Sequence, residues 1–424
     1  MKKTCRNRLK LSLLSAAALL FGIASAALPA RAADPIKIGT GMALTGGLAA
    51  NGKAAILAMK IWEEEINAKG GLLGRPVQLI YYDDQSNPST VPGIFTKLLD
   101  VDKVDLICGD YGTNLLAPAM PVVIQHNMTF FALFGLDVNR EFQYPRYFAM
   151  QPAGGPNPSA AFSQGFFEVA AAQNPKPKTL AIMAADAEFP HNAADGAREN
   201  AKKAGLQIVY DKTYPPNTTD YSPIVRAVDA ANADVVFSAS YPPDAVGIVR
   251  AANEIGLKAK LFGGGLVGLQ YASIKQQLGP MLNGIVNYDF WEPAKTLEFP
   301  GVEEFLKKYQ AKAASEGVDP LGYYLPPFAY ANLQVLQAAV EGTNSLDQDK
   351  LADWLRKNTI KTIVGDLAFG SNGEWKEARV LQIQFHDVKG SDLDQWKTDE
   401  KQTILWPDKY ATGKTAYPYS DAKK

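Results

Sequence analysis

The sequence is poor in the residues that build disulfides and metal sites. Its 424 residues include two cysteines and three histidines. Cys5 precedes the apolar part of an N-terminal segment, which leaves Cys108 as the cysteine of the expected mature chain, and we predict a buried, inert thiol there. One cysteine excludes a disulfide framework, and His126, His191 and His386 lack metal-ligand spacing. We therefore expect no metal and no cofactor.

Catalytic motifs are missing as well. No His-Glu-x-x-His motif is present, and the one stretch similar to a nucleophile elbow, around Ser163, lies within 160–172, which has the pattern of a helix. An elbow needs a strand directly before the serine. Gly39 and Gly41 could begin a Gly-x-Gly-x-x-Gly dinucleotide-binding motif, but Leu44 occupies the position of its third glycine. These absences argue against an enzyme, and a secreted hydrolase is the weaker alternative.

Long apolar runs and an excess of basic residues are absent after the N-terminal segment. No later stretch approaches 18 consecutive apolar residues, the length typical of a membrane-spanning helix. Residues 1–33 combine a basic start, an apolar stretch at 11–28 and a cleavage pattern at 30–32, which predicts a secretory signal peptide and a periplasmic location. That segment holds six of the 43 Lys and Arg and no acid, so 37 basic residues face 44 acidic ones in the remainder, a net charge of −7. This balance, without a basic patch, argues against nucleic-acid binding.

What the sequence does have is a regular alternation of short apolar runs with helical patterns. Such an alternation predicts an α/β fold, with parallel sheets that carry helices on both faces. The runs of the first set lie at 36–41, 77–82, 104–108 and 130–134, and those of the second set at 179–183, 207–210, 234–238, 260–263 and 284–291.

Three candidate crossings, where the chain would pass from one domain to the other, divide the two sets. Gly, Pro and Asn gather at 152–158, a Glu-Pro pair follows the last run at 292–293, and a turn-rich stretch begins at 364. A second set that interrupts the first predicts two lobes around a cleft, and ligands of such sheets bind beyond the carboxyl ends of the strands. We predict lobe 1 at 34–150 and 292–363, lobe 2 at 151–291 and 364–408, and a loose C-terminal tail at 409–424.

One stretch combines several features of an anion site. The apolar run 104–108 is followed by Gly109 and Gly112, and Thr113 and Asn114 then stand where a helix should begin. The free N–H groups and the positive dipole end of a helix start favour a negatively charged group. We predict a cradle for a small anion here, with an ordinary structural turn as the alternative.

Several motifs carry a resemblance to a known family. The run Asn-Ala-Lys-Gly-Gly-Leu-Leu-Gly at 67–74, together with the stretches at 36–39, 44–46 and 83–88, closely resembles periplasmic solute-binding proteins of ABC importers, in the leucine or branched-chain amino acid-binding family. The resemblance implies a type I periplasmic-binding fold, in which two doubly wound parallel-sheet lobes are joined by a three-strand hinge. It also implies that the lobes close on a ligand and that the closed form docks on a membrane permease. We expect a monomer.

The resemblance further implies which positions contact the ligand. The loop after the third strand supplies backbone N–H and hydroxyl groups for a carboxylate. The loop after the fourth strand normally brings a hydroxyl, but Phe134 stands in that loop here, and Phe189 stands where the second lobe usually has tyrosine. The predicted contacts are Thr45, Tyr111, Gly112, Thr113, Ala132, Leu133, Phe134, Phe189, Tyr241 and Leu266.

The departures from the family pattern bear on the ligand. Phe134 and Leu266 replace polar groups, and no acidic residue stands near 264–267 to receive an ammonium group. A buried ammonium without a partner costs several kcal/mol. We therefore predict a small carboxylate without an amine, either an aromatic acid or an apolar aliphatic or keto acid. A branched-chain amino acid is the alternative if Asp137 or Asp244 reaches the amine, and a ligand sensor of the same fold is a second alternative.

Overall fold

A computed structural model describes residues 34–216 and 218–423. The predicted signal peptide at 1–33 lies outside the described residues. Residues 35–424 form one compact unit. No helix in the described part of the chain is long and apolar enough to span a membrane.

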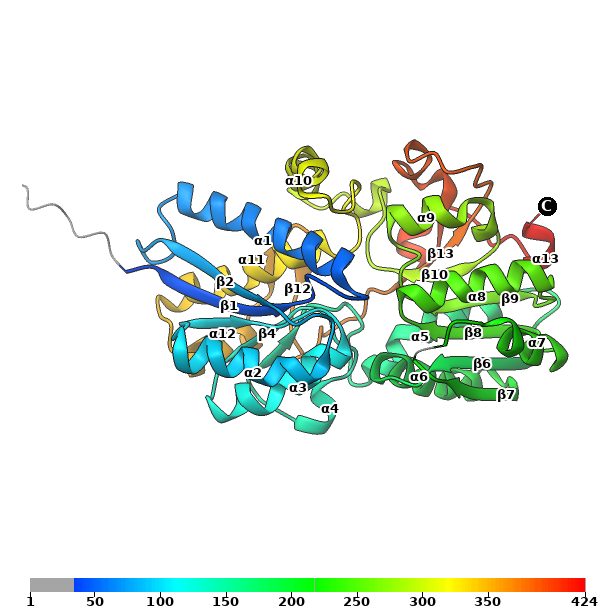
Figure 1. Ribbon diagram of the computed structural model, residues 1–424, viewed down its shortest axis with the longest axis horizontal. Coiled ribbons are helices and arrows are strands. Elements are labelled where there is room, and N and C mark those ends of the chain that lie inside the picture. The colour runs from blue at the N-terminus through cyan, green and yellow to red at the C-terminus, as the bar shows by residue number, and fades with distance from the viewer. Residues whose placement is uncertain (1–33, 217, 424) are drawn as a thin grey trace, which may run out of the picture. The chain divides into compact units, whose positions relative to one another are not determined.

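The first sheet has five strands in the order β2-β1-β3-β4-β5, and all its pairings are parallel (Figure 1). Helix α1 covers one face, whereas α2 and α3 pack together on the other. The strand order reverses at β1, the point at which ligands bind in open α/β sheets. The strands are β1 Ile36–Met42, β2 Val77–Asp83, β3 Leu106–Cys108, β4 Phe130–Ala132 and β5 Tyr147–Ala149; the helices are α1 Ala49–Ala68, α2 Val91–Thr96, α3 Thr113–Gln125 and α4 Asn139–Phe142.

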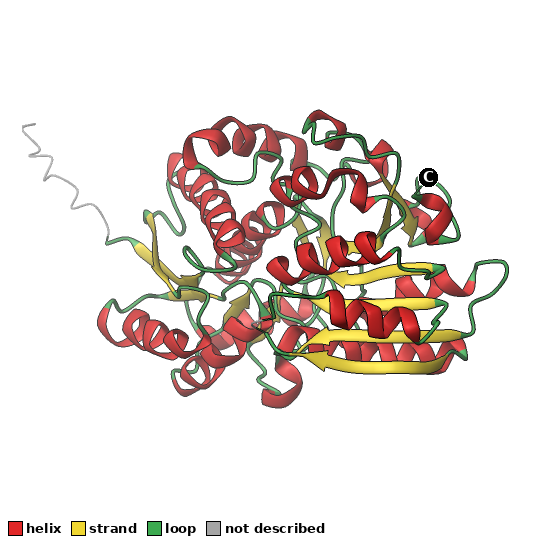
Figure 2. Cartoon of the chain, turned by 45° about the vertical axis from the view of Figure 1, so that its right-hand side comes forward, coloured by secondary structure: helices red, strands yellow, loops and turns green. Residues whose placement is uncertain are grey.

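The second sheet has seven strands in the order β14-β13-β10-β9-β8-β6-β7. The five strands from β6 to β10 are parallel, and β13 and β14 join antiparallel at one edge. Helices flank this sheet on both faces (Figure 2). The strands are β6 Thr179–Ala185, β7 Gln207–Tyr214, β8 Val235–Ser240, β9 Leu261–Leu266, β10 Val286–Asp289, β13 Leu381–Phe385 and β14 Gln402–Trp406; the helices are α5 Pro158–Ala171, α6 Glu188–Ala204, α7 Ser222–Ala230, α8 Pro242–Ile255 and α9 Ala272–Leu278.

The chain passes between the two sheets three times. It leaves the first sheet after β5, returns after β10 to add helices beside α1, and crosses again after a two-stranded hairpin. Helix α11 packs on α1, where Trp62 Nε1 donates a hydrogen bond to Gln337 Oε1 at 3.2 Å. The returning segment contains α10 Val302–Glu316, α11 Pro326–Thr343, α12 Gln348–Lys357, β11 Ile360–Thr362 and β12 Gly365–Leu367. This arrangement agrees with the α/β fold that the sequence predicts.

The C-terminal region differs from its prediction. The sequence predicts a loose tail at 409–424. The chain there instead forms α13 Tyr419–Ala422, and Tyr419 is fully buried. Its ring lies 5.4 Å from the ring of Phe262, and its N–H donates to the Lys260 carbonyl at 2.7 Å. Strand β14 is also absent from the prediction. Both segments are stabilised by long-range contacts, which a local pattern does not reveal.

Candidate functional site

The loop after β3 has the geometry of a cradle. Gly112 adopts a φ of 111°, which favours glycine, and its N–H donates to the Phe134 carbonyl at 2.8 Å. Helix α3 begins at the next residue, Thr113. Because the N–H groups of a first helical turn have no acceptor within the helix, this turn offers donors and positive potential to a ligand.

The hydroxyl of Thr113 is oriented by its neighbour. Thr113 Oγ1 accepts a hydrogen bond from the Leu136 N–H at 3.0 Å. A hydroxyl that accepts one hydrogen bond still has a proton to donate. The Thr113 side chain is 3 % exposed, so this donor faces a nearly dry environment in which a carboxylate would be bound strongly.

A narrow pocket of about 20 Å³ lies at this cradle. None of its lining residues is charged. It is lined by Tyr111, Gly112, Thr113, Phe134, Gln151, Phe189, Tyr241, Val267, Tyr288 and Tyr324. These residues come from β10, from loops and helix starts beside both sheets, and from the loop before α11, so the pocket forms where segments far apart in the sequence meet.

The structure brings together six of the ten residues predicted as ligand contacts and separates the other four from the pocket. The six are Tyr111, Gly112, Thr113, Phe134, Phe189 and Tyr241. Thr45 instead donates from Oγ1 to Asp83 Oδ2 at 2.8 Å. Ala132, Leu133 and Leu266 are fully buried in the core.

Four lining residues are missing from the prediction. Val267 directly follows Leu266, the residue predicted to contact the ligand. Successive residues of an extended chain face opposite sides, so Val267 lines the pocket while Leu266 faces the core. Tyr288 lies in β10, inside the aromatic run Tyr-Asp-Phe-Trp, which is a signal that could have been used. Gln151 and Tyr324 lie beside crossing segments and carry no local signal.

The pocket wall is a continuous aromatic cluster with Phe134 near its centre. The ring centroid of Phe134 lies 5.1 Å from that of Phe290, 5.2 Å from Phe328 and 5.7 Å from Tyr324. The ring of Phe189 lies 6.0 Å from that of Tyr241. These spacings suit edge-to-face and offset packing, and an aromatic ligand could add to the same pattern.

Tyrosine hydroxyls give this apolar wall its polar groups. Tyr111 and Tyr271 hydroxyls lie 2.9 Å apart, and those of Tyr288 and Tyr324 lie 3.0 Å apart. Tyr241 donates to Asn114 Oδ1 at 2.9 Å. Burial raises the pKa of Tyr111 to about 12, so its phenol stays protonated near neutral pH. The polar groups of the pocket are therefore neutral.

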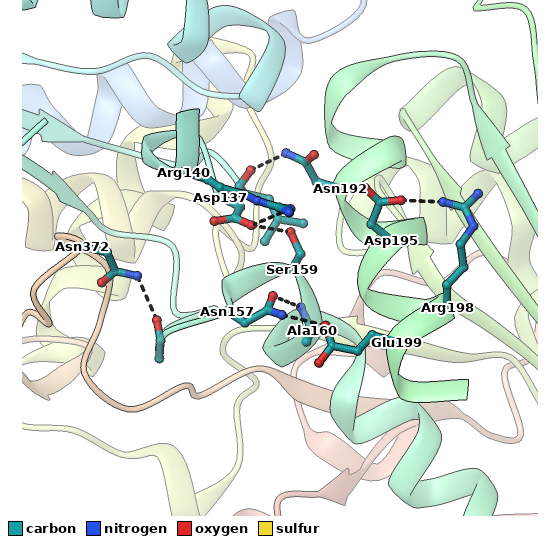
Figure 3. A network of polar contacts seen from close by, with 12 residues as sticks. Asp137, Arg140, Asn157, Ser159, Ala160, Asn192, Asp195, Arg198, Glu199 and Asn372 are labelled. Carbon is teal, nitrogen blue, oxygen red and sulfur yellow. Dashed lines mark hydrogen bonds and ion pairs between the residues drawn. The ribbon is translucent and has the colours of Figure 1, made fainter. Parts of the chain in front are cut away.

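The two acids considered as amine partners are engaged elsewhere. Asp244 accepts a hydrogen bond from the Tyr221 hydroxyl at 2.7 Å. Asp137 accepts from Ser159 Oγ at 2.8 Å and lies 3.9 Å from Arg140 (Figure 3). Burial raises the pKa of both carboxyl groups. Neither lines the pocket.

Acidic residues near the cradle support the loops. Asp83 Oδ1 accepts from the N–H groups of Leu44 and Thr45 at 2.9 and 3.1 Å, which makes it a cap of the strand end. Asp110 Oδ1 accepts from the Tyr111 N–H at 2.7 Å, and burial together with the charge of Asp84 raises its pKa well above the usual range. Within residues 34–216 and 218–423, no group of three or more His, Cys, Asp or Glu could hold a metal ion.

Comparison with known proteins identifies the class. The family described as periplasmic binding protein matches residues 35–383, and the chain belongs to that family. A Leu/Ile/Val-binding protein homolog of Brucella suis is 26 % identical over 388 residues, which cover 89 % of this chain and 94 % of the relative.

Two structures with a bound ligand are among the solved structures that are similar to the chain. A solute-binding protein of an ABC transporter from R. palustris in complex with 4-hydroxybenzoate has a TM-score of 0.71 at 19 % identity, with 90 % of this chain and 98 % of that one covered. The branched-chain amino acid transporter substrate-binding protein of Streptococcus pneumoniae in complex with isoleucine has a TM-score of 0.70 at 18 % identity, with 88 % and 100 % covered. The protein has the type I periplasmic-binding fold and is a binding protein of the ABC transporter type, not an enzyme.

Proposed function

We propose that this protein captures an aromatic carboxylic acid without an amine and delivers it to an ABC-importer permease. The observation that carries this proposal is the uncharged, aromatic lining of the pocket beside a helix start. An ammonium group buried there would have no carboxylate partner, which costs several kcal/mol. A carboxylate, in contrast, would meet donors at the start of α3.

The pocket residues have separable roles in this proposal. The ligand carboxylate accepts hydrogen bonds from the first turn of α3 and from the Thr113 hydroxyl. The ring of the ligand packs against Phe134 and Phe189. The hydroxyls of Tyr288 and Tyr324 can exchange a hydrogen bond with a ring substituent, because each phenol both donates and accepts.

Closure of two lobes is the proposed mechanism. Tyr241, at the start of α8, bonds Asn114 in α3, and Tyr111 bonds Tyr271, so the closed state has hydrogen bonds that an open state would lack. A ligand that contacts both sides shifts the population toward closure. We propose that the lobes have the predicted boundaries, and that the protein acts as a periplasmic monomer after removal of a signal peptide.

A ligand screen tests the proposal directly. Thermal unfolding is measured with benzoate, 4-hydroxybenzoate, leucine and isoleucine at equal concentrations, and affinities follow by calorimetry. We expect the aromatic acids to raise Tm and the amino acids to have little effect. Stabilisation by leucine or isoleucine alone would refute the proposal and favour the amino acid function suggested by the names of the relatives.

A substitution at the cradle tests the orientation of the ligand. Thr113→Val removes a hydroxyl that would bond a charged group, so we expect the affinity for the stabilising acid to fall by at least about tenfold. Thr113→Ser keeps the hydroxyl and serves as the matched control. Equal affinity in the valine and serine variants would show that the carboxylate binds elsewhere.

A further inference from the structure

Arg379 lies where the three crossing segments meet. It belongs to the segment between β12 and β13, and its backbone N–H donates to the Pro152 carbonyl at 2.7 Å, in the crossing after β5. Its guanidinium carbon lies 4.7 Å from the ring centroid of Phe299, in the crossing after β10. It also lies 5.0 Å from the ring of Trp375. Through its backbone and its side chain, this one residue thus contacts all three connections between the sheets.

The guanidinium of Arg379 has no anionic partner. The residue is 6 % exposed, and Nε and Nη2 are buried with no hydrogen-bond partner among the described residues. Burial lowers its pKa to about 10, against the opposing effect of Tyr410, whose side chain hydrogen-bonds the guanidinium. At neutral pH the group is therefore still charged. By comparison, Arg198 forms ion pairs with Asp195 and Asp211 at 2.6 and 2.7 Å.

A cavity of about 310 Å³ is lined in part by Arg379. Lys376 and Lys409 line it as well, and neither forms an ion pair with another described residue. The acids on its wall, Asp366 and Glu377, are exposed and do not pair with Arg379. Lys376 and Lys409 are exposed as well, so three cations and two carboxylates line the cavity, which leaves a positive balance beside the two unpartnered donors of Arg379.

We propose that this cavity binds a small oxyanion, a phosphate or a carboxylate group, on Arg379 with help from Lys376 and Lys409. Guanidinium donors match the geometry of both groups, and cation–π contacts hold the side chain in place. Because Arg379 contacts every crossing, an oxyanion there restrains the connection between the sheets. The site is separate from the aromatic pocket and does not depend on the proposed function.

The test measures thermal unfolding of the full chain in potassium phosphate, potassium acetate and potassium chloride at constant ionic strength. We expect a saturable rise in Tm of about 3 °C with phosphate or acetate over chloride. The anion that acts at the lower concentration identifies the preferred group. Phosphate line broadening in ³¹P NMR of the wild-type protein gives a second measurement that requires no variant.

Three variants locate the effect. Arg379→Met should abolish the anion-dependent rise in Tm. Arg356→Met is the matched control, since Arg356 also packs on a ring, that of Phe148 at 5.2 Å, but donates to the Ser371 carbonyl, and it should keep the rise. Tyr309→Phe, at a residue outside both cavities, should also keep it. Failure of every anion to raise Tm above chloride, or an equal rise in Arg379→Met, would overturn the proposal.

Discussion

Replacement of Tyr241 by phenylalanine isolates one bond between the two halves of the pocket. The hydroxyl of Tyr241, in the loop before α8, donates to Asn114 Oδ1 in α3 at 2.9 Å. Its ring packs on Phe189, and that contact survives in the variant. Tyr241→Phe therefore removes a hydrogen bond and leaves the packing in place.

The expected loss of affinity follows from the kind of hydrogen bond that is removed. A hydrogen bond between neutral groups contributes about 1 kcal/mol net, so its loss should weaken the closed state about fivefold. Ligand binding requires closure, and the apparent Kd should rise by the same factor. Since the bond does not lie inside either sheet, the midpoint of urea unfolding without ligand should change little.

Calorimetric titration of the stabilising acid measures the effect. Tyr309→Phe is the matched control, because the Tyr309 hydroxyl is buried without a hydrogen-bond partner in the described chain and lies outside the pocket. A double-mutant cycle with Asn114→Ala should give a coupling of about 1 kcal/mol. Unchanged affinity in Tyr241→Phe, or single-variant losses that simply add, would refute a role for this bond in closure.

Three further outcomes are expected. Gly52→Ala should destabilise the fold by about 2 kcal/mol or more in urea, since the added Cβ would lie 1.9 Å from the Ala43 carbonyl oxygen, whereas Gly47→Ala, with open space, should be neutral. Phe134→Ala should cost about 3–5 kcal/mol in the same assay because it opens the centre of the aromatic cluster. Burial raises the pKa of Asp289 to about 6, so the folded chain holds a proton that the unfolded chain releases, and stability falls as pH rises from about 4 to 6. Asp289 and Glu292 are buried together and titrate as a pair, so Asp289→Asn should reduce that fall without abolishing it when unfolding is compared at pH 4 and pH 7; an unchanged pH profile would contradict the assignment.

The sequence by itself determined the elements that depend on neighbours in the chain. The alternation of apolar runs with helical patterns predicted the parallel strands β1–β4 and β6–β10, because the periodicity of burial is a local property, but it predicted neither β5 nor β14. Gly112 and Thr113 marked the turn and the start of α3 for the same reason: a positive φ and a helix start each require particular residues at particular places. The motifs near the N-terminus then specified the family.

The tertiary structure decided which side chains share the pocket. Tyr324 and Gln151 enter it from segments beside the crossings, and their places depend on how the two sheets meet. The same holds for Arg379. Its burial among the three crossings, with Nε and Nη2 unpartnered, cannot be predicted from its neighbours in the sequence. A residue's own neighbours in the chain specify its backbone and its face, but contact across the fold depends on long-range packing, which the local sequence does not encode.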